Sequence, residues 1–321
     1  MTVKTERVIT SRNVIGRIMM QLNAPPAGWV AATSMEINSD QDEEEYGWLG
    51  MAPELREWVG SRQAAGLRES TYKVRNKHFE ATLDIPTRWL RRDKTGQLEI
   101  RIADLTRRGN DHWAKLLTQL IIDGESTACY DGQYFFDVDH SEGDSGTQSN
   151  DISVDISAVP AELHGTTTAP SVEEMQYAIS AGIAQIQSFK DDQGAPLNAD
   201  ASQFLVMVPT TTMHLTANRA VGGIVKGASA IPSQLNVDPG VGVSVAQNPR
   251  LVGSWSDKFA IFRTDSPMKP FIRQAETPLM VAAKAEGSEY EFDHDAHQYG
   301  IDGWRNVGYG LWQQGCLVTL A

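Results

Sequence analysis

The most constraining feature of the sequence is a helical pattern over residues 102–123. Gly109 lies near its middle and lowers local helix stability by about 1 kcal/mol relative to alanine, so other elements must pack there. Gly124 follows as a C-terminal cap. We therefore predict a long helix with one wide buried stripe, around which the flanking segments are organised. The apolar residues of the stripe are Ile102, Leu105, Trp113, Leu116, Leu117, Leu120 and Ile121.

Composition narrows the class of protein. The 321 residues carry a net charge of −13 at pH 7, which disfavours a protein that grips nucleic acid through its phosphates. A protein that encloses nucleic acid without binding it tightly stays compatible with this charge. Apolar runs are too short for a membrane helix, and the N-terminal residues lack the apolar core of a signal peptide. Cys129 and Cys316 are too few for a disulfide framework, so we expect a reducing compartment.

Charge is unevenly distributed along the first hundred residues. An acidic run precedes a basic stretch, and these are either solvated faces of one chain or complementary surfaces on neighbouring copies. We predict the second arrangement. The acidic partner region comprises Asp42, Glu43, Glu44 and Glu45. The basic residues expected between subunits are Lys73, Arg75, Lys77, Arg88, Arg91, Arg92 and Lys94.

Two segments before the long helix differ in their composition and expected structure. Residues 1–45 are expected to form an N-terminal arm, because Pro25 ends any earlier helix and the segment has little core of its own. Residues 46–70 are expected to form a packed helical entry in which Trp48 and Trp58 are structural anchors.

Residues 71–100 have the period of strands and are basic and half apolar. Pro86 interrupts the alternation, and a turn at Gly96 precedes a further strand with Leu98 and Ile100. An isolated two-stranded excursion is marginal alone, so we expect this segment to lie on another subunit. The alternating residues are Tyr72, Val74, Phe79, Ala81, Leu83 and Ile85.

A dense aromatic block follows the long helix. A turn at Asp131 and Gly132 is expected to lead into an aromatic strand. We expect four aromatic residues of the block and of the C-terminal region to be structural anchors: Tyr130, Phe135, Phe136 and Trp312.

The second half of the chain is typical of a compact α/β unit followed by strands. Ser171 and Glu174 form a capping box that opens a helix. Residues 203–208 predict a buried strand and residues 210–220 a helix, whereas residues 222–248 have no sustained period and predict a long loop. Further strands are expected at residues 250–255 paired with 259–263, and at 271–274, 279–282 and 299–320.

Candidate chemistry near the aromatic block is weak. Cys129 and His140 could act as a nucleophile and its base, but no protease signature surrounds Cys129, and a structural cysteine is the expected state. Asp137, Asp139 and His140 lack the glycine and the terminal glutamate of a calcium loop.

The remaining metal candidate comprises Asp293, His294, Asp295 and His297, but adjacent residues point apart, so at most two converge. The chain has no phosphate-binding loop, dinucleotide fingerprint or serine nucleophile elbow. We predict no catalytic residue, cofactor or metal, and a chain built for association.

Several spaced motifs resemble one family. The matches keep the family's order and span residues 46–313. The chain resembles the Mu-like phage major head subunit family, although nothing matches before residue 46 and Ser141 replaces a usual proline. The motifs are YGWLG at 46–50, EWVG at 57–60, CYDGQ at 129–133 with Phe135, Phe136 and His140, Tyr299-Gly300, NVG at 306–308 and GLWQ at 310–313.

The resemblance implies an α+β capsid fold of the Hong-Kong-97 type. It implies an N-terminal arm (1–45), a peripheral-domain entry (46–70), an extended loop (71–100) and a peripheral domain with a spine helix (101–150). An axial domain (151–264) and peripheral return strands (265–321) follow.

The function implied is that of a major capsid protein. Copies would assemble as pentamers and hexamers of an icosahedral shell, in the bacterial cytoplasm, around double-stranded DNA that they do not bind tightly. Scaffold, portal and decoration proteins are possible partners, and no membrane is involved. An encapsulin-like shell and a hydrolase using Cys129 and His140 are the alternatives. Some shells of this fold cross-link through a loop lysine, but we predict that Lys73, Lys77 and Lys94 do not react.

Overall fold

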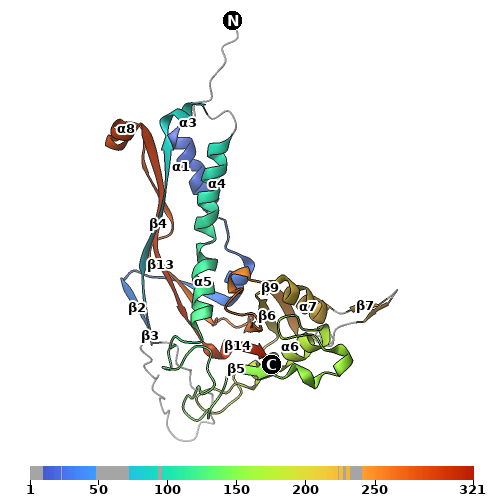
Figure 1. The fold of residues 1–321 in the computed structure, drawn as a ribbon. Coiled ribbons are helices and arrows are strands. Elements are labelled where there is room, and N and C mark those ends of the chain that lie inside the picture. The colour runs from blue at the N-terminus through green and yellow to red at the C-terminus, as the bar shows by residue number, and fades with distance from the viewer. Residues whose placement is uncertain are drawn as a thin grey trace, which may run out of the picture.

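The computed structural model describes residues 10–22, 24–47, 72–92, 96–222, 224–226, 229–231 and 241–321. Trp48, Trp58, Lys94 and the side chain of Arg92 lie outside the described part, as does most of the predicted entry segment. Helices and sheets are mixed, as the predicted α+β class requires. Figure 1 shows an elongated arm of helix and sheet that extends from a second, more compact unit.

The predicted long helix is present as α4 (Gln97–Asn110) and α5 (His112–Asp123). Asp111 interrupts it, yet backbone hydrogen bonds continue across the break. The Asp111 N–H donates to Arg107 O at 2.9 Å, and the Lys115 N–H donates to Asp111 O at 3.1 Å. The two helices therefore act as one rod along the arm (Figure 1).

The rod begins earlier than predicted. Leu98 and Ile100, expected in a strand, lie in the first turn of α4. Gly96, at a φ of 71°, turns the chain directly into the helix. Leu98, Ile102 and Leu105 are buried on one helical face, so their packing selects the helix over the short strand.

Gly109 marks the closest approach to the rod. A Cβ atom there would lie 2.9 Å from Ile301 Cδ1 and 3.1 Å from Leu22 Cδ2. The prediction that other elements pack at this glycine is confirmed, because only a missing side chain lets them come so near.

The first sheet lies along the rod. Its order is β1 (Ser34–Asn38), β11 (Phe271–Ala275), β13 (Ala296–Tyr309) and β12 (Met280–Lys284), and β4 (Lys77–Pro86) also pairs with β13. β4 and β13 are antiparallel over ten residue pairs. The expected extended loop is therefore paired within its own chain at β4, where its apolar residues pack on the rod.

The predicted arm is also anchored in its own chain. α1 (Ser11–Leu22) buries Val14 and Ile18 completely in the core shared with α4. After α2 (Gly28–Thr33), β1 runs parallel to β11. The expectation of an arm with little core is wrong here, because two buried residues one helical turn apart are enough to dock α1.

The second sheet forms the compact unit. Its order is β5 (Asp151–Val154), β14 (Gly315–Leu320), β10 (Lys258–Arg263), β6 (Gln203–Val208) and β9 (Gly242–Gln247). β6 is an almost continuous apolar run, as expected of a strand covered on both faces, and five of its six residues are buried. β10 pairs with β14 and β6, so the predicted pairing with residues 250–255 is wrong. Pro249 begins a short 3-10 helix there instead.

Helices cover this second sheet. α6 (Val172–Ser188) opens with the predicted capping box, in which Ser171 and Glu174 satisfy each other's backbone N–H groups. α7 (Thr211–Gly222) follows β6 as predicted. The predicted loop at 222–248 contains three strands: β7 (Ile224–Lys226), β8 (Ser229–Ile231) and β9. β9 was not predicted, because this strand forms by parallel pairing with β6, which is distant in the sequence.

Smaller elements complete the described chain. β2 (Glu43–Tyr46) pairs with β3 (Tyr72–Arg75), and α3 (Thr87–Arg92) and α8 (Glu289–His294) lie at the far end of the arm (Figure 1). A 3-10 turn (Trp312–Gln314) joins β13 to β14. Among the described helices, none combines the length and apolarity needed to cross a membrane.

His112 lies where α5 meets the first sheet. Its ring lies edge-on against Phe79 of β4, with centroids 4.4 Å apart. Burial, with the positive charges of Arg305 and Lys115, lowers the pKa of His112 from 6.5 to about 4. The folded chain therefore holds a neutral imidazole at mildly acidic pH, where the unfolded chain holds a charged one.

We predict that the free energy of unfolding falls as the pH is lowered from about 6.5 to about 4. Between these values the unfolded chain binds a proton on His112 that the folded chain does not, which favours unfolding. The partial exposure of the ring limits this contribution to about 1–3 kcal/mol. Urea unfolding of His112→Gln should show a flatter pH dependence than that of the original chain.

The control for this prediction is the same pair of proteins at pH 8. His112 is neutral in both states there, so the difference reports only the packing cost of the substitution. An identical loss of stability on acidification in both proteins would contradict the prediction.

Candidate functional site

The acidic and basic runs meet within one chain. β2 pairs with β3 so that Glu45 lies opposite Lys73. Lys73 Nζ lies 3.8 Å from a Glu45 oxygen, and Arg75 Nε lies 3.1 Å from an Asp42 oxygen. Exposed ion pairs of this kind contribute about 0–1 kcal/mol each. Asp42, Glu45, Lys73 and Arg75 were all predicted to contact another subunit, but each already has an ion-pair partner in its own chain.

Three basic residues of the predicted set are free of such pairing. Lys77 begins β4, and Arg88 and Arg91 are exposed on α3. Among the described residues, none of the three has an acidic partner. Thr87 Oγ1 donates to Asp295, which follows α8 and holds α3 against the end of β13. Arg88 and Arg91 therefore present unpaired positive charge at the tip of the arm, and Lys77 does so at the opposite end of β4.

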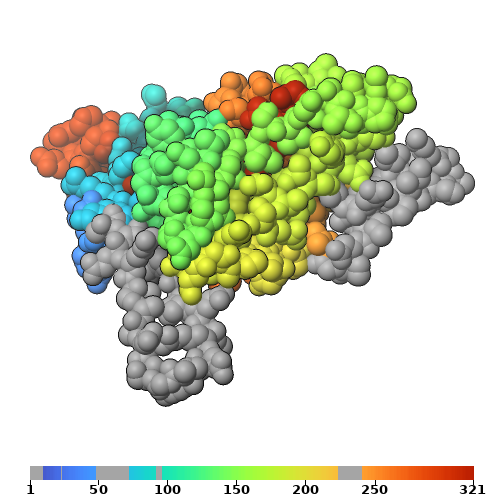
Figure 2. All heavy atoms as spheres, turned by 90° about the horizontal axis from the view of Figure 1, so that it is seen from below, coloured from blue at the N-terminus to red at the C-terminus, as the bar shows by residue number. Residues whose placement is uncertain are grey.

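The aromatic block lies at the other end of the rod, on the underside of the molecule, where Figure 2 shows this part of the chain in green. The predicted turn is confirmed: Gly132 has a φ of 90°, and one bridge joins Ala128 to Tyr134. The predicted aromatic strand is reduced to that single bridge. Phe135 is fully buried and stacks on Tyr309 of β13, with ring centroids 4.9 Å apart. The block thus packs the end of the rod onto the first sheet.

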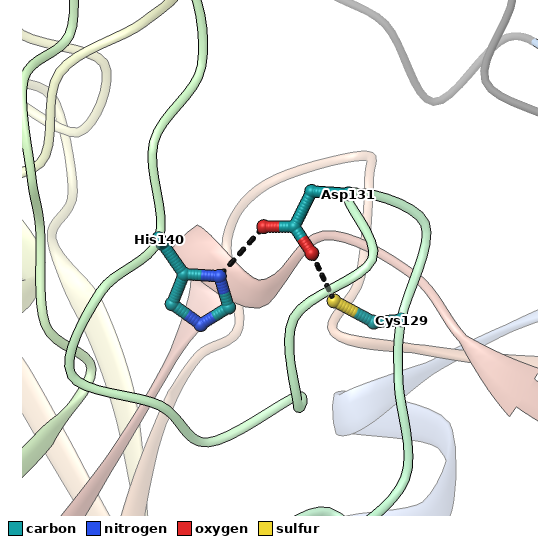
Figure 3. A group of neighbouring side chains, drawn as sticks. All are labelled: Cys129, Asp131 and His140. Atoms are coloured by element: carbon teal, nitrogen blue, oxygen red, sulfur yellow. Dashed lines mark hydrogen bonds and ion pairs between the residues drawn. The ribbon is translucent and has the colours of Figure 1, made fainter.

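The same turn brings Cys129, Asp131 and His140 together (Figure 3). Cys129 Sγ donates to Asp131 Oδ1 at 3.0 Å, and His140 Nδ1 lies 2.6 Å from Asp131 Oδ2. Burial raises the pKa of Asp131, but hydrogen bonds from His140 and Cys129 outweigh it and bring the pKa below its usual range. Burial and the Asp131 carboxylate raise the pKa of the Cys129 thiol well above its usual range.

Glu142 lies next to this cluster. Its Oε1 accepts hydrogen bonds from Tyr130 Oη, from Trp312 Nε1 at 3.1 Å and from Gln313 Nε2 at 3.1 Å. Burial raises the pKa of Glu142. His140 stacks on Trp312, with centroids 3.9 Å apart and rings 7° from parallel. The loop 129–142 is therefore fastened to the turn between β13 and β14.

This geometry does not form a cysteine nucleophile and its base. His140 Nδ1 faces Asp131, so the thiol proton is held by a carboxylate and not by the imidazole. Cys129 is also only 5% exposed, and its raised pKa disfavours the thiolate that a nucleophile requires. The hydrolase alternative loses its structural basis.

The other candidate groups do not converge on a cation. His294 is exposed and stacks on Tyr290, whereas His297 is buried with Nε2 2.9 Å from Glu291. Asp137 accepts hydrogen bonds from the backbone N–H groups of Tyr134 and Val138. In the described part of the chain, the single group of three potential ligands is Cys129, Asp131 and His140.

Asp131 and Glu142 were missed by sequence reasoning. Glu142 could not be identified from a local pattern, since it binds Trp312, which is 170 positions away. The available signal for Asp131 was its place between Cys129 and His140 in the aromatic block.

The architecture defines a class of protein. A long rod packed on one sheet, connected to a second sheet that helices cover, is the arrangement of the Hong-Kong-97-type capsid fold. A solved structure of this class, the asymmetric unit of the mature capsid of bacteriophage PhiM1, has a TM-score of 0.55 over 93% of this chain and 89% of that chain, at 9% identity.

The chain belongs to the family of the Mu-like prophage major head subunit gpT, whose model matches residues 20–160 and 236–319. One relative is the Mu-like prophage FluMu major head subunit of Haemophilus influenzae, 27% identical over 236 residues, which cover 73% of this chain and 76% of that protein. Another is the major capsid protein of Escherichia phage Mu, 36% identical over 107 residues, which cover 33% of this chain and 35% of that protein.

We predict that Glu142→Ala lowers the free energy of unfolding by about 2–4 kcal/mol, because three donors lose their common acceptor. Glu142→Gln keeps one carbonyl oxygen at this position and should cost less. Urea unfolding of the unassembled chain measures both. Glu162→Ala, at an exposed glutamate, is the matched control and should change stability by less than about 0.5 kcal/mol. Equal losses for Glu142→Ala and Glu162→Ala would refute this role for Glu142.

Proposed function

We propose that this chain is the major capsid subunit of a tailed phage or prophage, which assembles with copies of itself into pentamers and hexamers of an icosahedral shell. The observation that carries the proposal is the family match to both halves of the chain, on a capsid fold. Family membership also favours a phage head over the encapsulin-like shell that the fold alone permits.

The two structural units have different parts in the proposed shell. The rod and the first sheet correspond to a peripheral domain, which spans the distance between ring centres. The second sheet, with α6 and α7, corresponds to an axial domain near the ring centre, where one chain must close rings of both five and six copies. β14 belongs to this second sheet, so the axial unit extends beyond the predicted boundary at residue 264.

The charge of the chain is consistent with a container for DNA. A net charge of −13 repels duplex DNA, so a packed genome would be enclosed without tight binding. Both cysteines are free and buried, as suits assembly in the reducing cytoplasm of a bacterium. Scaffold, portal and decoration proteins are candidate partners of such a shell.

The proposal predicts particles. Electron microscopy and light scattering of the purified, concentrated chain should detect closed shells or rings of five and six copies. Where the chain alone stays monomeric, co-expression with the other head-assembly proteins of its phage supplies a missing scaffold. A chain that remains monomeric under both conditions would contradict the proposed function.

We further propose that the unpaired basic residues of the arm bind acidic surfaces of neighbouring copies. Arg88→Glu with Arg91→Glu should reduce shell yield at low salt by about tenfold and leave the monomer folded, as measured by sedimentation and circular dichroism. Several exposed charges must act together, because each contributes about 0–1 kcal/mol. The unpaired basic residues are Lys77, Arg88 and Arg91; the expected set also includes Arg92 and Lys94, whose side chains lie outside the described part of the chain, with Glu43 and Glu44 on the acidic side.

The matched control is Arg88→Ala with Arg91→Ala, which removes both side chains without reversing their charge. Its yield should lie between those of the original chain and the reversal. High salt should narrow the differences, because salt screens exposed charges. Normal yield from the double reversal at low salt would rule out this contact.

A further inference from the structure

The buried cluster after α5 combines three kinds of metal ligand. A thiol, a carboxylate and an imidazole come from Cys129, Asp131 and His140, and their ligand atoms all lie within 4.8 Å of one another (Figure 3). The Cys129 and His140 residues are 5% and 0% exposed, and the Asp131 side chain is 6% exposed. The cluster is therefore a preformed, nearly dry group of donors and not a set of surface acids.

The charge around the cluster favours a cation. Asp131 and Glu142 are two buried carboxyl groups in one neighbourhood, and among the described residues neither forms an ion pair with lysine or arginine. Buried anions without cationic partners are costly. In the described chain, His140 is the ion-pair partner of Asp131, and its Nε2 atom is buried without a hydrogen-bond partner. Hydrogen bonds stabilise the Asp131 carboxylate, but no lysine or arginine of the described chain neutralises it, and His140 Nε2 has no hydrogen-bond partner.

We propose that Cys129, Asp131 and His140 bind one divalent transition-metal ion of the zinc type. A set of one sulfur, one nitrogen and one oxygen suits zinc, whereas magnesium and calcium require mainly oxygen ligands. Typical bond lengths of about 2.0–2.3 Å separate tetrahedral ligands by about 3.3–3.6 Å. Cys129 Sγ now lies 3.0 Å from Asp131 Oδ1, and His140 Nδ1 lies 2.6 Å from Asp131 Oδ2, so each separation needs to open by less than about 1 Å. These contacts involve different oxygens, so the carboxylate also has to rotate to present one oxygen to the ion. A fourth position is left for water or a second Asp131 oxygen.

Binding has a defined proton balance. The Cys129 thiol releases its proton to solvent and binds the ion as thiolate. The proton on His140 Nδ1 moves through solvent to Nε2, so that Nδ1 can bind the ion. Asp131 exchanges its contacts with Cys129 and His140 for the ion and keeps the hydrogen bond from the Gln133 N–H. Because that Nε2 proton has no acceptor among the described residues, the site should be weaker than a zinc finger, with a dissociation constant in the roughly micromolar range. The ion would clamp the loop 129–140 beneath Trp312.

Cobalt(II) is the probe for this site, because a cobalt–thiolate bond adds a charge-transfer absorption and tetrahedral cobalt an intense visible band. The purified full chain, freed of metal with a chelator, is titrated with cobalt and then with zinc. One cobalt per chain with thiolate absorption, displaced by zinc, is the expected result. Equilibrium dialysis against a fixed excess of zinc, followed by elemental analysis, should give about one bound zinc per chain.

Cys316 provides the matched control, since it is also free and buried but lies on β14, in the second sheet. Cys316→Ser leaves Cys129 as the one cysteine and should retain the full thiolate absorption. Cys129→Ser and His140→Asn should each reduce cobalt affinity at least tenfold. Where these two variants fail to fold, the Cys316→Ser result decides alone.

A folded Cys316→Ser chain without cobalt–thiolate absorption would overturn the proposal, as would zinc content below about one in ten chains. The proposal does not rest on the proposed capsid function, because binding is measured on the folded chain whether or not it forms shells.

Discussion

The pairing of β13 is the constraint on which the rest of the structure depends. Its first ten residues pair with β4, and its later residues pair with β11. β12 pairs with Gln298–Asp302 of β13, on the edge opposite β4. A shift of one residue would turn every side chain of β13 to the opposite face, so one register fixes three neighbours at once. The chain then continues into β14 at the interior of the second sheet, and the same strand therefore also ties the two units together.

The end of β13 leaves no room for side chains. A Cβ atom on Gly308 would lie 2.5 Å from Val74 Cγ2, and one on Gly310 would lie 2.2 Å from Lys269 O. The second contact is with a backbone oxygen that cannot move aside. Aromatic pairs such as Phe135 and Tyr309 add about 0.5–1.5 kcal/mol each to this junction. Close approach at these two glycines sets the geometry of the junction, and aromatic packing then stabilises it.

The elements that were predicted correctly are those that interactions between near neighbours in the sequence determine. The spine helix, the Ser171 capping box and the β6 strand follow from periodicity and caps, which a single sequence displays. The start of α4 and the docking of the N-terminal helix did not follow, because distant partners decide them. The same division holds at the site: we expected Phe135 and Trp312 to be structural anchors because they lie in aromatic segments of the sequence, and both are fully buried. Glu142 was missed, because its donors come from residues that only the fold brings near.

Association by the arm would combine many weak contacts with a rigid frame. An exposed ion pair contributes too little to hold two copies together, and the pairs between β2 and β3 are already satisfied within one chain. In a closed shell, each contact recurs at every equivalent position, so binding at one edge holds the next edge at high effective concentration. Weak, salt-sensitive contacts then select the correct neighbour and release a wrong one, while the β13 ladder keeps each subunit's shape constant. Such a subunit needs a stiff spine more than it needs strong surface contacts, and in this chain a separate buried core packs α1 and α4 against β4 and β13 along the arm.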